Sequence, residues 1–128
     1  MRELLLTYLT ANLSKSIKTS QELPFEEGGN PLYLKNMKRV YLDEPYTETG
    51  LLIGALDGLG IDQTITRVRG FLALDAKNRN VDLDLALSII AQAKNQLTNS
   101  FRKEFDYTTT IDGSVMIFEF EYRAYNIA

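Results

Sequence analysis

Carboxylates are the side chains of this 128-residue chain that could do chemistry, and they are scattered along it. The chain has no histidine and no cysteine, so it lacks the commonest general base, the commonest metal ligand and every thiolate nucleophile. Oxygen ligands alone suit Mg²⁺. The acids numerous enough to suggest such a site are Asp43, Asp57, Asp62, Asp75 and Asp106. No two of them stand in a recognisable metal motif, so the sequence predicts no catalytic residue, no metal site and no cofactor.

Two further acidic groups have simpler explanations. Asp82 and Asp84 lie two residues apart in a predicted helix, where their side chains do not face each other, so capping explains them better than acid–base chemistry. Glu22, Glu26 and Glu27 lack the Asp/Asn spacing and the glycine of a calcium-binding loop. We interpret the segment that carries them as a solvated loop.

Composition favours one ordinary globular domain over residues 1–128, with 45% apolar and 24% charged side chains. The net charge is −3, and no basic patch or tail indicates a nucleic-acid partner. No run approaches the ~20 apolar residues of a membrane span. The N-terminus lacks the pattern of a signal peptide. We therefore expect a cytoplasmic chain with no membrane partner and no sequence-specific nucleic-acid partner.

The clearest structural pattern in the chain lies in the C-terminal stretch, Phe101 to Asn126. Both of its arms alternate with a period of two, which is typical of strands with one buried face. On the first arm one face carries Phe105, Tyr107, Thr109 and Ile111. On the second arm the predicted core face carries Met116, Phe118, Phe120, Tyr122 and Ala124. Asp112-Gly113 between the arms predicts a hairpin with a type I′ turn.

Two stretches have the three- and four-residue apolar spacing of helices. Residues 2–18 carry one stripe and residues 81–98 the other. The stripes consist of Leu5, Leu6, Leu9, Leu13 and Ile17, and of Leu83, Ala86, Leu87, Ile90, Ala93 and Leu97.

The remaining segments are less regular. Residues 19–31 are a predicted loop, 32–43 one strand or two short ones, and 63–76 a strand. Residues 46–62 thread four glycines through leucines, which we interpret as an apolar loop with a helical turn and as a possible subunit contact. This order of elements predicts an α+β fold: a mostly antiparallel four- to five-stranded sheet with two helices packed on one face.

The order of elements, at this length, resembles the tail-terminator (tail-completion) proteins of long-tailed bacteriophages. The resemblance rests on the leading helix Glu3 to Lys18, Val40 to Pro45, the strand end Phe71 to Ala76, the helix Leu83 to Leu97 and the closing strand Phe118 to Arg123. It implies a hexameric ring that sits on the last ring of the tail tube, stops tube growth and presents a surface to the head's neck. The implied partners are further copies of the chain, the tail-tube protein and the head–neck connector protein. The implied location is the tail of the virion, after assembly in the host cytoplasm. Such assembly work needs no active site, so we expect the chain not to be an enzyme.

Ring closure needs head-to-tail contacts, and the mixed face of the last strand is the candidate for them. The candidate subunit interface consists of Ile117, Glu119, Glu121, Arg123 and Tyr125, with complementary charge from Arg67, Arg69, Arg102 and Lys103. An equally good interpretation is that these side chains form cross-strand pairs within one chain, such as Glu119 or Glu121 opposite Lys103.

Other functions remain open at this point. A head-completion or neck adaptor protein is also a ring former. A small ligand-binding α+β domain or a carboxylate enzyme belongs to a different class, and so does a regulatory dimer.

Overall fold

The structure is a computed structural model, and it describes residues 1–13, 17–20, 38–53, 61–75, 81–113 and 115–127. In chain order its elements are α1 (Arg2–Asn12), β1 (Lys18–Ser20), β2 (Arg39–Leu42), β3 (Tyr46–Ile53), β4 (Ile61–Asp75), α2 (Val81–Gln92), the 3₁₀ helix η2 (Ala93–Gln96), β5 (Arg102–Asp112) and β6 (Val115–Ile127). No helix in this described part is long and apolar enough to cross a membrane.

All described strands belong to one sheet of order β1-β2-β4-β6-β5, with β3 paired to β4. The long strand β4 pairs with β3 along its first half and with β2 along its second half, on the same edge. Every pairing is antiparallel except the short one between β1 and β2. The predicted α+β class, with a mostly antiparallel sheet and two helices, is confirmed.

Both helices cover the same face of the sheet, as predicted, and share one core with it. Strand side chains alternate between faces, so every second residue of β4 and β6 turns towards the helices. The buried members of this core are Leu5, Leu9, Ile17, Val40, Leu42, Val68, Leu72, Leu74, Ala86, Ile90, Ala93, Leu97, Met116, Phe118, Phe120, Tyr122 and Ala124.

Two features lock the helices and the sheet together. The fully buried Tyr122 donates a hydrogen bond from its hydroxyl to the backbone carbonyl of Ile90 on α2. Burial raises the pKa of the Tyr122 hydroxyl, so this group stays a donor. On β4, Gly70 leaves room for the ring of Phe120, because a Cβ at Gly70 would lie 2.2 Å from Cε2 of that ring.

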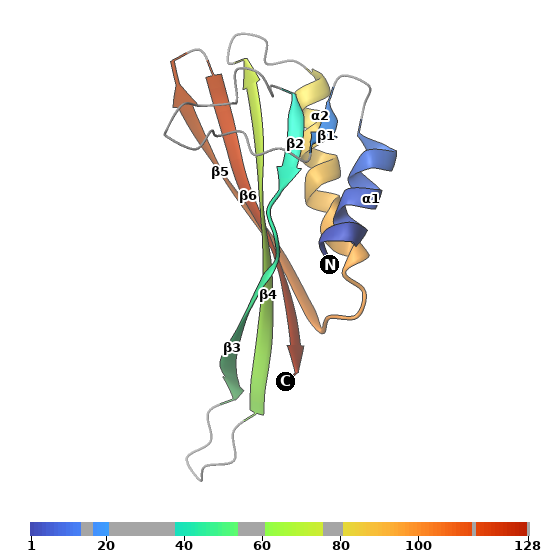
Figure 1. Cartoon of the computed structure of the whole chain (residues 1–128), viewed down its shortest axis with the longest axis vertical. Helices are drawn as coiled ribbons and strands as arrows, with labels where there is room; N and C mark the ends of the chain where they lie inside the picture. Colours follow the sequence, from blue (N-terminus) through green and yellow to red (C-terminus); the bar gives the residue numbers. More distant parts are fainter. Residues whose placement is uncertain (14–16, 21–37, 54–60, 76–80, 114, 128) are drawn as a thin grey trace.

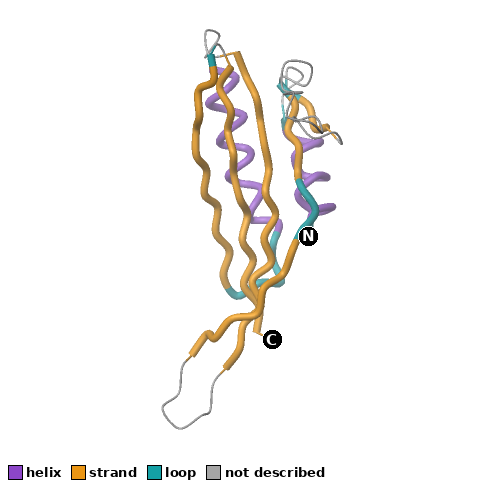
Figure 2. Tube along the Cα trace, turned by 60° about the vertical axis from the view of Figure 1, so that its left-hand side comes forward, coloured by secondary structure: helices purple, strands orange, loops and turns teal. Residues whose placement is uncertain are grey.

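The β3 strand and the first half of β4 extend past the ends of the helices, towards the end of the molecule where the C-terminus lies (Figure 1). The turned view shows the same arm standing clear of the helices (Figure 2). We call β3 together with Ile61–Arg67 the arm. The end of β6 supports it, with pairs from Gln63↔Ile127 to Arg67↔Arg123.

The helix predicted over residues 2–18 is too long. α1 ends at Asn12, whose side-chain amide donates to the carbonyl of Tyr8, and Leu13 is already extended. Strand β1 follows and pairs with β2, so the predicted loop over 19–31 is wrong at residues 19 and 20. The rest of that predicted loop lies outside the described residues. Ile17 is buried, but beside β1 rather than on a helical stripe.

The loop predicted over residues 46–62 is wrong at both ends, where β3 and the start of β4 lie. Pairing from Tyr46↔Arg67 to Ile53↔Ile61 overrides the weak strand propensity of glycine. Gly50 is tolerated in this pairing, because the nearest atom to a Cβ there would be the side-chain nitrogen of Gln63, 4.0 Å away. Residues 54–60, with the remaining glycines of the stretch, lie outside the described residues.

The other predicted elements agree with the structure to within a few residues. β4 confirms the strand over 63–76, and α2 with η2 confirms the helix over 81–98. β2 confirms the end of the strand over 32–43; residues 32–37 lie outside the described residues. The hairpin is confirmed, but Asp112 still belongs to β5 and pairs with Val115, and of Asp112 and Gly113 only Gly113 has a positive φ, so the predicted turn is one residue early.

Candidate functional site

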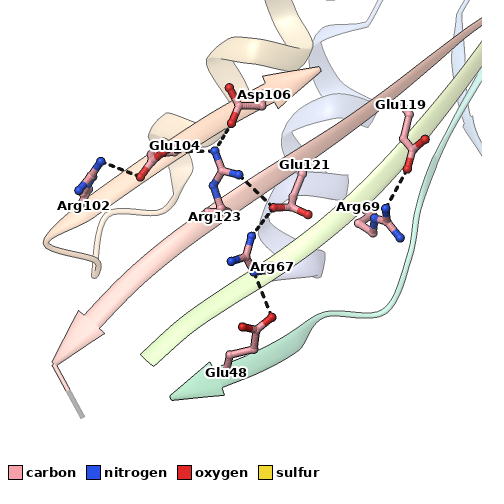
Figure 3. A network of polar contacts seen from close by, with 9 residues as sticks. All are labelled: Glu48, Arg67, Arg69, Arg102, Glu104, Asp106, Glu119, Glu121 and Arg123. Carbon is pink, nitrogen blue, oxygen red and sulfur yellow. Dashed lines mark hydrogen bonds and ion pairs between the residues drawn. The ribbon is translucent and has the colours of Figure 1, made fainter. Parts of the chain in front are cut away.

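The face of the sheet opposite the helices carries the candidate site, and we call it the open face. On this face β4 presents Arg67 and Arg69, which lie directly across from Arg123 and Glu121 of β6. The next strand, β5, places Glu104 and Asp106 across from the same two residues of β6. Alternation therefore brings basic and acidic side chains of four strands onto one surface (Figure 3).

Arg123 stands at the centre of this surface, and its side chain is only 18% exposed. Its guanidinium donates to Glu104 Oε2 at 3.2 Å, to Glu121 Oε1 at 3.3 Å and to Asp106. Desolvation by burial acts to lower the pKa of Arg123, but the carboxylates around it, led by Asp106, raise the pKa overall. Arg123 therefore holds β5 and β6 together by charge.

Arg67 extends the network to the arm. It donates to Glu121 Oε1 at 2.7 Å and lies 3.3 Å from Glu48 of β3. Hydrogen bonding to Glu121 raises the pKa of Arg67. Glu121 thus joins Arg67 to Arg123, and the network spans β3, β4, β6 and β5 (Figure 3).

Two more arginines lie at the margins of the network. Arg69 pairs with Glu119 at 3.0 Å, and both side chains are about half exposed, at 51% and 43%. Arg102 pairs with Glu104 at 2.9 Å and lies over the ring of Tyr125, 5.2 Å from its centroid. These exposed pairs add little stability, since water and salt screen them.

Glu104 and Tyr125 are coupled. A hydrogen bond from Tyr125 holds the pKa of the Glu104 carboxyl below its ordinary value, and Arg102 and Arg123 act in the same direction. The pKa of Tyr125 is raised, first by burial and then by the same hydrogen bond and the Glu104 charge. The carboxylate and the neutral hydroxyl are therefore the paired forms near neutral pH.

Seven of the nine predicted interface residues come together on the open face around these pairs: Arg67, Arg69, Arg102, Glu119, Glu121, Arg123 and Tyr125. Ile117 also lies on this face, but it packs against Ala73 and Val115 in a small separate cluster. Lys103 lies across from Ala124, a core residue, and so belongs to the other face. The suggested pairing of Lys103 with Glu119 or Glu121 is therefore wrong, because their cross-strand partners on β5 are Thr108 and Asp106.

Sequence reasoning missed the acids that complete the network, Glu48, Glu104 and Asp106. The alternation of β5 places Arg102, Glu104 and Asp106 on one face, so two of the three had a visible signal. Glu48 had no such signal, because the glycines of residues 46–62 predicted a loop there rather than a strand.

A hollow of about 200 Å³ lies on the open face between Arg69 and Arg123. Both arginines are already paired to carboxylates there. Within the part of the chain that the structure describes, no three acidic side chains are grouped so that they could hold a metal ion. The arrangement can make charged contacts with another surface.

Comparison with known proteins adds no family. No protein-family model matches the chain, and no curated protein matches it either.

Proposed function

We propose that this chain is the subunit of a ring that caps the tail tube of a long-tailed bacteriophage, stops its growth and offers a surface for joining the head. The observation that carries the proposal is the form of the sheet. Helices cover one face, the other face is charged, and the arm extends past the helical layer. A subunit that must meet neighbours on two sides and a tube below needs uncovered sheet surface of this kind.

The resemblance in order of elements supports the same role. The confirmed elements keep that order: a leading helix, strands, a second helix and a closing hairpin. The described residues offer charged pairs and no grouped metal ligands, which fits an assembly role without requiring it.

The test is a mass measurement in solution followed by negative-stain imaging with tail tubes assembled without a terminator. We expect a ring-forming species, or a monomer that becomes a ring on the tube end. Tubes mixed with the protein should stop growing and should carry an extra layer of density at one end. A stable dimer without affinity for tubes would overturn the proposal.

A further inference from the structure

One edge of the sheet is β5, and the opposite edge is β3 along the arm and β1, outside β2, along the rest. In the described part of the chain β3 pairs only with β4, and β5 pairs only with β6. The outer edge of each strand therefore presents backbone N–H and C=O groups that another strand can pair with. The five residues at the start of β3, Tyr46 to Gly50, include one charged side chain, Glu48, so this edge has little of the charge that natural edges use to prevent pairing.

The register of the sheet relates these two edges residue by residue. Glu48 of β3 pairs with Ile65, Ile65 with Tyr125, and Tyr125 with Arg102 of β5. One row across the sheet thus begins with an acid at one edge and ends with a base at the other. Both end side chains are accessible, at 55% for Glu48 and 64% for Arg102. They lie on the same face, because directly paired residues share a face.

The directions of β3 and β5 would allow the β3 edge of one subunit to pair with the β5 edge of another. β3 and β6 both run antiparallel to β4, and β5 runs antiparallel to β6, so β3 is antiparallel to β5. A second copy of the chain, related to the first by rotation about an axis that runs along the strands, has its strands in the same directions, so its β5 would also be antiparallel to β3 of the first copy. A closed ring has no rise from one subunit to the next, so equal rows meet at equal heights.

We propose that a second copy of this chain pairs its β3 edge with the start of β5, with Glu48 of one copy opposite Arg102 of the next. This inference rests on the proposed ring and names the contact that closes it. The adjacent rows agree with it, because Thr47 then meets Lys103 and Tyr46 meets Glu104, and no like charges oppose each other. Glu48 and Arg102 also have partners within the chain, Arg67 and Glu104, but they stand at the edges and are more than half exposed. Glu121 and Arg123, at the centre of the open face, are less exposed and serve to hold the edges in place.

Paired cysteines test the contact directly, because the chain has none of its own. In the variant Glu48→Cys/Arg102→Cys the two thiols of one chain lie about three strand spacings apart, ~14 Å, too far for a disulfide. Across the proposed contact they are directly opposed. We expect mild oxidation of the assembled protein to give a ladder of covalent oligomers that ends in a closed ring. The single variants Glu48→Cys and Arg102→Cys should give no cross-link.

Charge reversal supplies an independent measurement. Glu48→Arg and Arg102→Glu should each weaken self-association about tenfold or more, because each places like charges opposite each other. The double variant should recover most of the loss. The matched control is Asp84→Lys, a reversed exposed charge on α2, on the helical side of the sheet, which should associate as the wild type does.

The outcomes separate this contact from the tail role. Covalent rings without affinity for tail tubes would support the proposed β3–β5 contact and overturn the tail-terminator proposal. Capped tubes on which the double cysteine variant forms no cross-link would keep the tail role and overturn the contact. Equal cross-linking by Arg102→Cys alone would mean a two-fold dimer through β5 and would also overturn it. A chain that stays monomeric at every concentration and on tubes would overturn both.

Discussion

Strand β6 shows both faces of the sheet side by side. Phe118, Phe120 and Tyr122 turn to the helices and are at most 2% exposed. Glu119 and Glu121 turn the other way and meet arginines of β4. Burying a large apolar side chain contributes about 1.5–3 kcal/mol, whereas an exposed ion pair contributes about 0–1 kcal/mol. The exposed pairs at the margins of the open face, such as Arg69 with Glu119, can therefore serve contacts at little cost to the fold, whereas the less exposed network around Arg123 still holds β5 and β6 together.

The largest expected effect is on the apolar face. Phe120→Ala should lower the free energy of unfolding by about 3–5 kcal/mol, because it removes a ring that contacts Phe105 and Tyr122. Urea unfolding followed by circular dichroism measures it. The matched control is Phe101→Ala, whose ring is 51% exposed and whose loss should change stability by roughly 0.5 kcal/mol at most. Equal losses for the two variants would contradict the division between the faces.

The second largest effect is expected for Gly70→Ala, which should lower the free energy of unfolding by about 1–3 kcal/mol through overpacking. The added methyl would meet the ring of Phe120 and the side chain of Leu42. In combination with Phe120→Ala its cost should largely disappear, since the ring that it strikes is gone. A double-mutant cycle in urea checks this, and strictly additive losses would show that the two residues do not touch.

A prediction for the open face concerns pH. The pKa of Glu104 lies below its ordinary value in the folded chain, so its stabilising contribution is present above the unfolded pKa, about 4.3. That contribution is lost as the pH falls through the lower folded pKa. Glu104→Gln should therefore unfold more easily at pH 7 and lose less stability on acidification. Parallel stability curves for variant and wild type from about pH 7 to pH 3 would contradict the coupling of Glu104 with Tyr125 and the arginines.

The smallest expected effect is at Arg69 and Glu119. Replacing either by alanine should cost about 0–1 kcal/mol, and the coupling between them in a double-mutant cycle should fall further at high salt. Thermal unfolding at low salt and at about 1 M salt measures both quantities. A coupling above about 2 kcal/mol that resists salt would show that this face is as important for stability as the helical one.

The sequence predicted those parts of the fold in which a local period is strong. The alternation of β6 and the apolar spacing of α2 identified their buried faces, because neighbours along one element share a face. The alternation of β5 did not, because Tyr107 and Ile111, on the same face as Phe105, are 56% and 63% exposed. The strand β3 was missed, because its threonines and Gly50 have no strong period and only pairing with β4 makes them a strand.

The ion pairs were beyond prediction for a different reason. Arg67 and Glu121 are 54 residues apart, and they meet only because β4 and β6 pair in one particular register. β4 and β6 are separated in the chain by α2 and β5, so no turn length fixes that register. Packing of both strands against the two helices fixes it instead.

The hydrogen bond from Tyr122 to Ile90 bears on how α2 is held against the sheet. Apolar contacts between a helix and a sheet are nearly as good after the helix slides by one turn, since another row of aliphatic side chains then meets the strands. A single buried donor breaks that equivalence, because a slide would leave both the hydroxyl and the carbonyl without partners. The hydrogen bond of Tyr122 thus selects one axial position of the helix. Tyr122→Phe keeps the ring but removes the hydroxyl that donates to Ile90. It should preserve most of the packing while broadening the amide resonances of α2, as the helix samples neighbouring positions.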